Sequence, residues 1–359
     1  MRLGKCDSLR YHHCAFLKKA VLRKQARQRN TARRREALSV CDQYVGERGP
    51  NAAQYHDDDF DWSDCVEEGE RAVEKQKQER IQFQGNAGGL VHEVGQALGP
   101  VAVSSEEDVA DIERYETKMK NNNKTYSDDW ETFHRLHSAG RFFKEKRYLT
   151  LEFPCLLDEG DDTSGLRIGE IGCGCGSALI PVLRANERAT AVACDVSKTA
   201  TRVFREMCQK AGIENDRVEL HVHAAGKSNC SPFQDNSCDI MMIIFTLSAM
   251  SPSEMTCVLS EAKRALKSPG GLLLVRDYGK YDMAQLRFPG SQLIDPGNMV
   301  YERADGTLSS FFSREQLESL VADIGLECKE CKYVCTNITN KKDGKNMRRV
   351  FIHGIFEKV

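Results

Sequence analysis

The residues best placed to do chemistry are a glycine-rich turn and an acidic residue about twenty positions later. The turn, Glu170-Ile171-Gly172-Cys173-Gly174-Cys175-Gly176, lies between a predicted strand and a predicted helix. Glycine lets such a turn adopt unusual dihedrals and lets a ligand touch bare backbone. Asp195 ends the next predicted strand, where a carboxylate can accept both hydroxyl hydrogen bonds of a ribose. Together they predict a nucleoside site; the alternative is that Asp195 caps the helix starting near Ser197.

The spacing of the glycines indicates which nucleoside the turn binds. The dinucleotide pattern G-x-G-x-x-G, counted from Gly172, requires glycine at position 177, which is Ser177. S-adenosylmethionine has no pyrophosphate to cradle, so the observed G-x-G-x-G spacing favours that cofactor. The expected cofactor-binding residues here are Glu170, Gly172, Gly174, Gly176 and Asp195.

Alternating strands and helices position these residues from Leu166 onward. The predicted strands are 166–171, 190–195, 218–222, 239–245, 271–277, 327–335 and 347–356. The predicted helices between them are 178–185, 198–211, 252–266 and 314–324. Continuous apolar runs at 240–245 and 272–275 are typical of strands buried on both faces.

The order of these elements predicts an α/β fold of the class I Rossmann-like type. Its sheet has seven mostly parallel strands and ends with an antiparallel hairpin, whose turn lies at 341–345. This is the layout of S-adenosylmethionine-dependent methyltransferases. A dinucleotide-binding dehydrogenase, the alternative, would more often continue with another βαβ unit.

The sequence becomes distinctive at the end of the fifth predicted strand. Arg276-Asp277-Tyr278-Gly279 is followed by the segments 281–288, 305–307 and 311–313. With 244–249, Trp130, Phe133, 142–144 and 152–154, they strongly resemble the tRNA 3-methylcytidine methyltransferases over roughly residues 125 to 356. Asp61-Trp62-Ser63 and the charged residues after it resemble the N-terminal extension of the branch that acts on threonine tRNAs. The resemblance implies methyl transfer to N3 of an anticodon-loop cytidine.

Carried over position by position, the family's cofactor contacts fall on Trp130, His134, Gly174, Asp195 and Ile244. The chain departs from the family at two places. His134 replaces a tyrosine, and the aspartate expected near the adenine after the third strand is replaced by Ala224 and Ala225. Losing that carboxylate removes a hydrogen bond worth about 1 kcal/mol, unless a group such as Ser228 substitutes.

The expected chemistry depends on positioning, because neutral cytosine already carries a lone pair on N3. Asp277, at the carboxyl end of the fifth strand, is expected to accept from the cytosine amine and to stabilise the forming cation. The alternative is a structural pair with Arg276 or a backbone cap. The catalytic candidates are Asp277, Arg287 and Tyr281. The RNA-binding candidates are Lys144, Arg147, Arg276 and Tyr278, although a solvated helix face is the plainer interpretation of the segment 141–148.

The N-terminal part differs in charge from the rest. Residues 1–40 carry twelve Lys or Arg and two acidic residues, a net charge of +10. Because the whole chain has a net charge of −2, the remaining residues carry a net charge of −12. We expect a basic arm at 1–54, an acidic-aromatic segment with a helix at 64–80 and a linker at 84–107 within 55–124, and a methyltransferase domain at 125–359. A further helix is predicted at 130–146. The arm is expected to bind tRNA or to be a targeting segment.

Composition bounds the remaining possibilities. The chain has 40% hydrophobic residues and no apolar run of about 18 residues, so no membrane partner is expected. The fifteen scattered cysteines favour a reducing compartment, the cytoplasm first, with mitochondrial or nuclear targeting as the alternative. Cys328, Cys331 and Cys335 supply too few ligands for a predicted zinc site. The expected partners are tRNA and a tRNA-presenting protein; the competing functions are methylation of protein or a small molecule, and an inactive tRNA-binding subunit.

Overall fold

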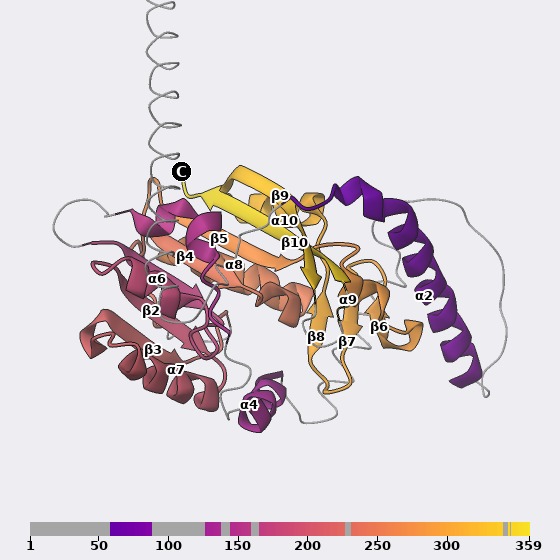
Figure 1. Cartoon of the computed structure of the whole chain (residues 1–359), viewed down its shortest axis with the longest axis horizontal. Coiled ribbons are helices and arrows are strands. Elements are labelled where there is room, and N and C mark those ends of the chain that lie inside the picture. Colours follow the sequence, from indigo (N-terminus) through magenta and orange to yellow (C-terminus); the bar gives the residue numbers. More distant parts are fainter. Residues whose placement is uncertain are drawn as a thin grey trace, which may run out of the picture.

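A computed structural model describes residues 58–87, 126–137, 144–158, 165–226, 231–339, 344 and 346–359. A seven-stranded sheet forms its centre (Figure 1). In spatial order the strands are β3 (Val218–Val222), β2 (Thr190–Asp195), β1 (Arg167–Ile171), β4 (Ile240–Ile244), β5 (Leu272–Tyr278), β10 (Asn346–Glu357) and β9 (Glu327–Thr339). The first five are parallel, and β10 is antiparallel to both β5 and β9. The predicted fold class is confirmed.

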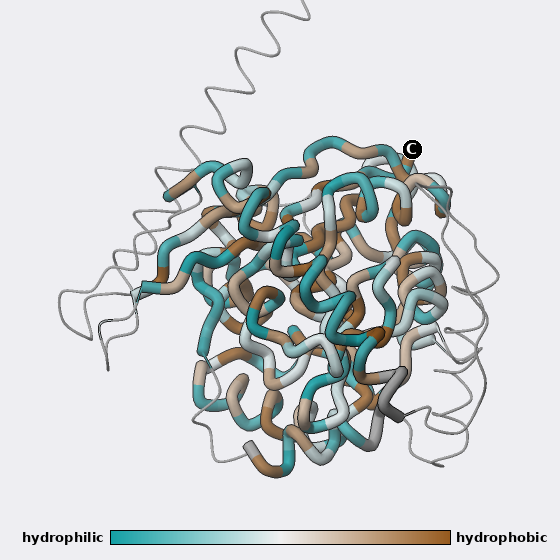
Figure 2. The backbone as a smooth tube through the Cα atoms, turned by 90° about the vertical axis from the view of Figure 1, so that its right-hand side faces the viewer, coloured by the Kyte–Doolittle hydropathy of each residue, from teal (hydrophilic) through white to brown (hydrophobic). Residues whose placement is uncertain are grey.

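Helices cover both faces of the sheet because its central strands are apolar on both sides. Met241 and Ile243 of β4 pack toward α8 (Pro252–Ala265) and α10 (Arg314–Asp323). Met242 and Ile244 face the opposite way, toward α6 (Leu179–Ala185) and α7 (Lys198–Lys210). All four helices predicted for this region begin and end within one residue of the observed bounds. The backbone alternates between hydrophobic and hydrophilic residues every few positions, as amphipathic elements require (Figure 2).

A small antiparallel sheet follows β5 and was not predicted. It consists of β6 (Leu293–Asp295), β7 (Val300–Glu302) and β8 (Leu308–Ser310), preceded by the one-turn helix α9 (Met283–Leu286). Strands of three residues are too short to show a period in the sequence. The 3-10 helix η6 (Gly290–Gln292) joins α9 to this sheet.

The segment 58–87 packs against this small sheet. It contains the 3-10 helix η1 (Trp62–Cys65) and α2 (Val66–Ala87), which lies beside β6, β7 and α9 (Figure 1). Gln76, only 4% exposed, donates to the carbonyl oxygens of Gln285 and Phe288 at 2.9 and 2.7 Å and accepts from the Tyr301 hydroxyl at 2.8 Å. These hydrogen bonds attach the N-terminal helix to the segment that follows β5.

The free edge of β9 is partly covered by residues just ahead of η1. The amide of Asp59 donates to the Cys335 carbonyl at 2.9 Å, and the Asp59 carboxylate accepts from the Asn337 amide at 2.7 Å. Trp62 stacks between Tyr333 and Tyr281, with ring centroids 4.4 and 5.6 Å away. This part of the N-terminal segment therefore contacts both β9 and the segment that follows β5.

Several sequence-based boundaries differ from the structure. The helix predicted at 130–146 is α4 (Tyr126–His137), and residues 144–146 are not helical; α5 (Leu149–Glu152) and η2 (Pro154–Leu157) follow. The helix predicted at 64–80 continues to Ala87, so the linker prediction is wrong at its start. Strand β9 runs four residues further than predicted because its polar end still pairs with β10. A 3-10 turn, η4 (Asn215–Arg217), precedes β3. The expected domain boundaries at 54/55 and 124/125, the basic arm, Ser228 and most of the hairpin turn lie outside the described residues.

Candidate active site

The three glycines of the turn have different roles. All have positive φ, +73° at Gly172, +51° at Gly174 and +80° at Gly176. A Cβ atom at Gly172 would meet the Thr246 side chain at 2.3 Å, and one at Gly176 would meet the Phe204 ring at 2.3 Å. At Gly174 the nearest heavy atom among the described residues is His134 Nε2, at 4.0 Å. Gly174 therefore offers open space where a ligand can contact backbone.

Asp195 is turned toward this opening. Its Oδ2 accepts from the Gly174 amide at 2.8 Å, and its Oδ1 accepts from the Ser197 amide at 2.9 Å. Burial raises the pKa of the Asp195 carboxyl, while His134 and these two amides act in the opposite direction. The N-cap of α7 is Ser197, whose hydroxyl accepts from the Ala200 amide at 3.0 Å. The alternative that Asp195 serves as this cap is therefore wrong.

Helix α4 is fastened over the turn by Glu131. The carboxylate accepts from the hydroxyls of Ser197 and Thr199 at 2.7 and 2.6 Å. Although burial opposes the charged form, these hydrogen bonds lower the pKa of Glu131 to about 2. The attachment brings Trp130 and His134 to the turn, with their ring centroids 5.9 Å apart.

Glu170 is a buried carboxylate with hydrogen-bonding capacity to spare. It is 1% exposed, and its Oε2 has no hydrogen-bond partner among the described residues. Burial raises the pKa of Glu170 to about 8, although the attraction of Lys146 acts against it. A buried polar atom without a partner indicates a missing ligand or water. With the open backbone at Gly174 and the carboxylate of Asp195, it fits a nucleoside cofactor that carries a cationic group.

The loop after β3 has small side chains where the family has an acid. Ala224 and Ala225 are half-buried. Glu261 of α8 holds this loop, because it accepts from the Gly226 amide at 2.5 Å and lies 3.5 Å from His223 Nε2. The loop therefore has no carboxylate at the two alanine positions, but the Glu261 carboxylate binds the backbone of the same loop.

Aromatic and acidic side chains lie close together at the ends of β4 and β5. Ile244 is buried at the end of β4, and Phe245 follows with a φ of +56°, its ring centroid 5.2 Å from that of Tyr278. Asp277 is completely buried; its Oδ2 accepts from the Ser248 amide at 3.0 Å and its Oδ1 from the Tyr278 amide at 2.8 Å. Burial raises the pKa of Asp277 to about 6, although these hydrogen bonds lower it.

Comparison with known proteins agrees with this geometry. A family model described as a methyltransferase domain matches residues 168–271. A tRNA N(3)-methylcytidine methyltransferase of Drosophila melanogaster is 36% identical over 235 residues, which cover 64% of this chain and 70% of the relative. A human tRNA N(3)-cytidine methyltransferase is 35% identical over 239 residues, which cover 64% of this chain and 79% of the relative.

The chain belongs to the tRNA N(3)-cytidine methyltransferase family. A solved S-adenosylmethionine-dependent methyltransferase from Methanosarcina mazei superposes with a TM-score of 0.44 at 18% identity and covers 55% of this chain and 94% of its own. The strand order, with its antiparallel β10, and the domain match agree on the fold.

Two residues predicted for this site are buried in the structure. Arg276 was predicted to bind RNA, but it is 3% exposed, and its guanidinium pairs with the buried Glu152 and packs on the Phe351 ring, 4.7 Å from the centroid. Tyr281 was predicted to be catalytic, but it is 5% exposed and stacks on Trp62. Both side chains are packed in the interior, and their roles in RNA binding and catalysis stay predictions. Asp277 accepts from the backbone amides of Ser248 and Tyr278, as in the backbone-cap alternative.

The other catalytic and RNA-binding candidates besides Asp277 are exposed or half-buried. Arg287 is exposed at the end of α9. Lys144 and Arg147 are exposed before α5, and Arg147 pairs with Glu145 at 2.7 Å. Tyr278 is half-buried. Among the described residues, no hydrogen bond links the Arg287 side chain to the glycine turn.

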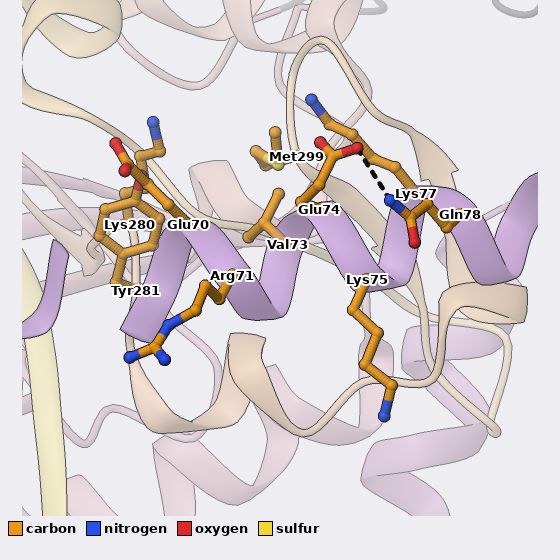
Figure 3. A pocket seen from close by; sticks show the side chains of 10 residues that line it. All are labelled: Glu70, Arg71, Val73, Glu74, Lys75, Lys77, Gln78, Lys280, Tyr281 and Met299. Carbon is orange, nitrogen blue, oxygen red and sulfur yellow. Dashed lines mark hydrogen bonds between the residues drawn. The ribbon is translucent and has the colours of Figure 1, made fainter. Parts of the chain in front are cut away.

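A hollow of about 640 Å³ lies along α2 (Figure 3). Its lining includes both signs of charge, from Glu70, Glu74, Lys77 and Lys280. Because its walls come from α2 and the segment after β5, it is not the cofactor site.

Sequence reasoning missed three residues of the site. Glu131 follows the predicted Trp130, and Phe245 follows the predicted Ile244. The helix and strand patterns of the sequence indicate only how such residues pack, not that they belong to a site. Lys146 was placed in a helix face, yet it reaches the turn. Among the described residues no group of three or more potential ligands could hold a metal ion, and no helix in the described ranges is long and apolar enough to cross a bilayer.

Proposed function

We propose that this chain transfers a methyl group from S-adenosylmethionine to N3 of a cytidine in the anticodon loop of a tRNA. The observation that carries the proposal is the opening at Gly174 with Asp195 directed into it, in a chain whose relatives are named tRNA N(3)-cytidine methyltransferases. The position in the anticodon loop comes from the resemblance of the segment after β5.

The site needs to bind and align rather than to remove a proton. When bound, S-adenosylmethionine supplies an electrophilic methyl group. Trp130, His134, Gly174, Asp195 and Ile244 would hold the cofactor. The target base must leave its stack and present N3 in line with the methyl–sulfur bond. The half-buried rings of Phe245 and Tyr278 at the ends of β4 and β5 are placed to stack with such a base.

Asp277 is proposed to accept a hydrogen bond from the amino group of the target cytosine. Each of its oxygens accepts one backbone N–H, and the Ser248 side chain also hydrogen-bonds to the carboxylate. Because the side chain is completely buried, the packing around it must move before the cytosine amine can reach it. We expect Asp277→Asn to lower kcat on tRNA while the cofactor affinity stays near that of the wild type; Tm should fall, because the new NH2 group faces a buried backbone donor. Unchanged turnover would reject the catalytic role.

Nucleoside mass spectrometry tests the reaction directly. Purified protein is incubated with S-adenosylmethionine and unmodified tRNA, and the digested nucleosides are examined for 3-methylcytidine. A second arm offers labelled methyl donor to protein and metabolite pools. Label in those pools without 3-methylcytidine would favour another acceptor. Cofactor binding without any product would favour an inactive tRNA-binding subunit or the need for a tRNA-presenting partner, which adding cell extract separates.

The basic arm at 1–40 is proposed to add sequence-independent affinity for tRNA. Its twelve Lys and Arg residues would neutralise phosphates and release counterions, which makes binding depend strongly on salt. We expect deletion of 1–40 to weaken tRNA binding and to flatten its salt dependence. If both are unaltered, the arm has a targeting or spacer role.

A further inference from the structure

A buried tyrosine hydroxyl connects α2 to the segment that follows β5. Tyr301 of β7 is fully buried, and its hydroxyl donates to Gln76 Oε1 of α2 at 2.8 Å. The same hydroxyl accepts from Nε2 of Gln285, a fully buried residue of α9, at 3.4 Å. Because burial raises the pKa of Tyr301 to about 12, the hydroxyl keeps its proton and can donate. The orientation of the Gln285 side chain therefore depends on Tyr301 and, through it, on α2 (Figure 1).

Gln285 in turn holds the backbone of Tyr281. Its Oε1 accepts from the Tyr281 amide at 2.6 Å. Tyr281 has a φ of +70°, a conformation that an aromatic residue adopts only when its surroundings impose it. Its ring stacks on Trp62 and lies against α2, where a Cβ atom on Gly69 would meet it at 2.3 Å (Figure 3). The N-terminal segment therefore holds this conformation through a chain of hydrogen bonds and through the packing of one ring.

Tyr281 lies in a turn, residues 279–282, whose two ends are fixed to β10. The Gly279 amide donates to the Val350 carbonyl at 3.0 Å, and the Asp282 carboxylate accepts from the Val350 amide at 2.8 Å. Relaxing φ of Tyr281 to an ordinary negative value rotates the chain strongly, so the two ends cannot both stay in place. The conformation of Tyr281 and the position of the whole turn are therefore coupled.

The turn continues directly from the acceptor side of the site. Asp277 and Tyr278 immediately precede it, and the Tyr278 amide donates to Asp277 at 2.8 Å. The glycine turn and Asp195 instead follow β1 and β2, which lie on the other side of β4 from β5. Movement of the turn should therefore reach the residues proposed to contact the target cytidine, and leave the cofactor side in place.

We propose that Tyr301 is a positioning residue for methyl transfer: its hydroxyl, through Gln285, keeps the turn 279–282 in the conformation that presents Asp277 and Tyr278 to the target cytidine. This inference rests on the proposed function, because it assigns a role to residues that support the acceptor side of the same site. Helix α2 then contributes to turnover through this chain of hydrogen bonds rather than by contact with the target base.

Tyr301→Phe tests the proposal because it removes one hydroxyl and leaves the other hydrogen bonds of α2 in place. Gln76 still donates to the carbonyl oxygens of Gln285 and Phe288. We expect Tyr301→Phe to lower kcat for 3-methylcytidine formation about tenfold at saturating tRNA and cofactor. The Kd for S-adenosylhomocysteine, measured by calorimetry, should stay within about twofold. Hydrogen exchange followed by mass spectrometry should be faster in the peptide that contains Tyr281 and unchanged in α2.

Tyr333→Phe is the matched control. It also removes a phenol hydroxyl, but that hydroxyl accepts from the Arg314 amide at 3.4 Å and lies outside the chain that reaches Tyr281. Its kcat should stay within about twofold of the wild-type value. If Tyr301→Phe does not fold, Gly69→Ala is used, because the added Cβ displaces the Tyr281 ring and should lower kcat without changing cofactor affinity.

Each other outcome overturns the proposal. Equal kcat values for the two tyrosine variants would show that the Tyr301 hydroxyl does not act on turnover. A higher KM for tRNA with unchanged kcat would assign this region to tRNA binding. A joint loss of kcat and cofactor affinity, or faster exchange throughout α2, would show a general packing effect. If the wild type binds S-adenosylhomocysteine but forms no 3-methylcytidine on any tRNA, the proposed function fails, and this inference fails with it.

Discussion

Replacing Gln76 with alanine should detach α2 from the rest of the molecule. The amide of Gln76 makes three hydrogen bonds, to Gln285, Phe288 and Tyr301. At about 1 kcal/mol each, their loss costs about 3 kcal/mol. That free energy corresponds to about a 100-fold larger population of the detached state. Hydrogen exchange followed by mass spectrometry should show faster exchange of the α2 amides.

A matched control is available on the same helix. Gln78 is exposed and makes only a 3.4 Å contact to Glu74, so Gln78→Ala should change the opening free energy of α2 by no more than about 0.5 kcal/mol. Alanine has a higher helix propensity than glutamine, so propensity does not explain a loss at Gln76. If both variants exchange alike, the hydrogen bonds of Gln76 do not hold the helix, and its contact with the segment after β5 depends on something else.

Three further predictions concern buried charges. Asp195→Asn places an amide group opposite an N–H donor, so we expect calorimetry to show S-adenosylhomocysteine and 5′-methylthioadenosine binding weakened alike, by about tenfold or more; a loss confined to one ligand would contradict the ribose assignment. Arg276→Met leaves Glu152 buried without the guanidinium and should destabilise the protein by about 3–5 kcal/mol in urea denaturation, whereas Arg287→Met should cost less than about 0.5 kcal/mol; equal costs would show that the pair of Arg276 with Glu152 does not stabilise the fold. Because burial raises the pKa of Glu170 to about 8, the native state retains a proton that the unfolded chain releases near its ordinary value, so the unfolding free energy of the ligand-free protein should fall as pH rises from about 5 to about 8. In Glu170→Gln this fall should be smaller, and parallel curves for the two proteins would show that Glu170 does not titrate in this range.

The strands and helices of the main sheet could be predicted because their patterns are long. The apolar run of β4 and the amphipathic pattern of α7 each extend over enough residues to show a period. The small sheet could not be predicted, because β6, β7 and β8 have three residues each and are held by contacts to α2 more than 200 positions away in sequence.

The candidate site shows where single-sequence reasoning stops. The turn and Asp195 have a characteristic spacing, so they could be identified before their hydrogen bond was known. The burial of Arg276 and Tyr281 could not be predicted, because sequence gives the type of a residue and not its exposure. Lys146 was missed for the converse reason, since only the fold reveals that a lysine in a basic run reaches the glycine turn.

The contact of Asp59 with β9 has a consequence for how the protein behaves at high concentration. An unpaired outer strand can add a strand from a second molecule and start aggregation. Here the end of β9 near Cys335 and Asn337 is occupied by the chain itself, while Glu327, Lys329, Glu330 and Lys332 place charges along the other end. Cutting the protein just before Trp62 would therefore uncover a template for self-association, and shortened versions should keep Asp58 and Asp59 to stay in solution.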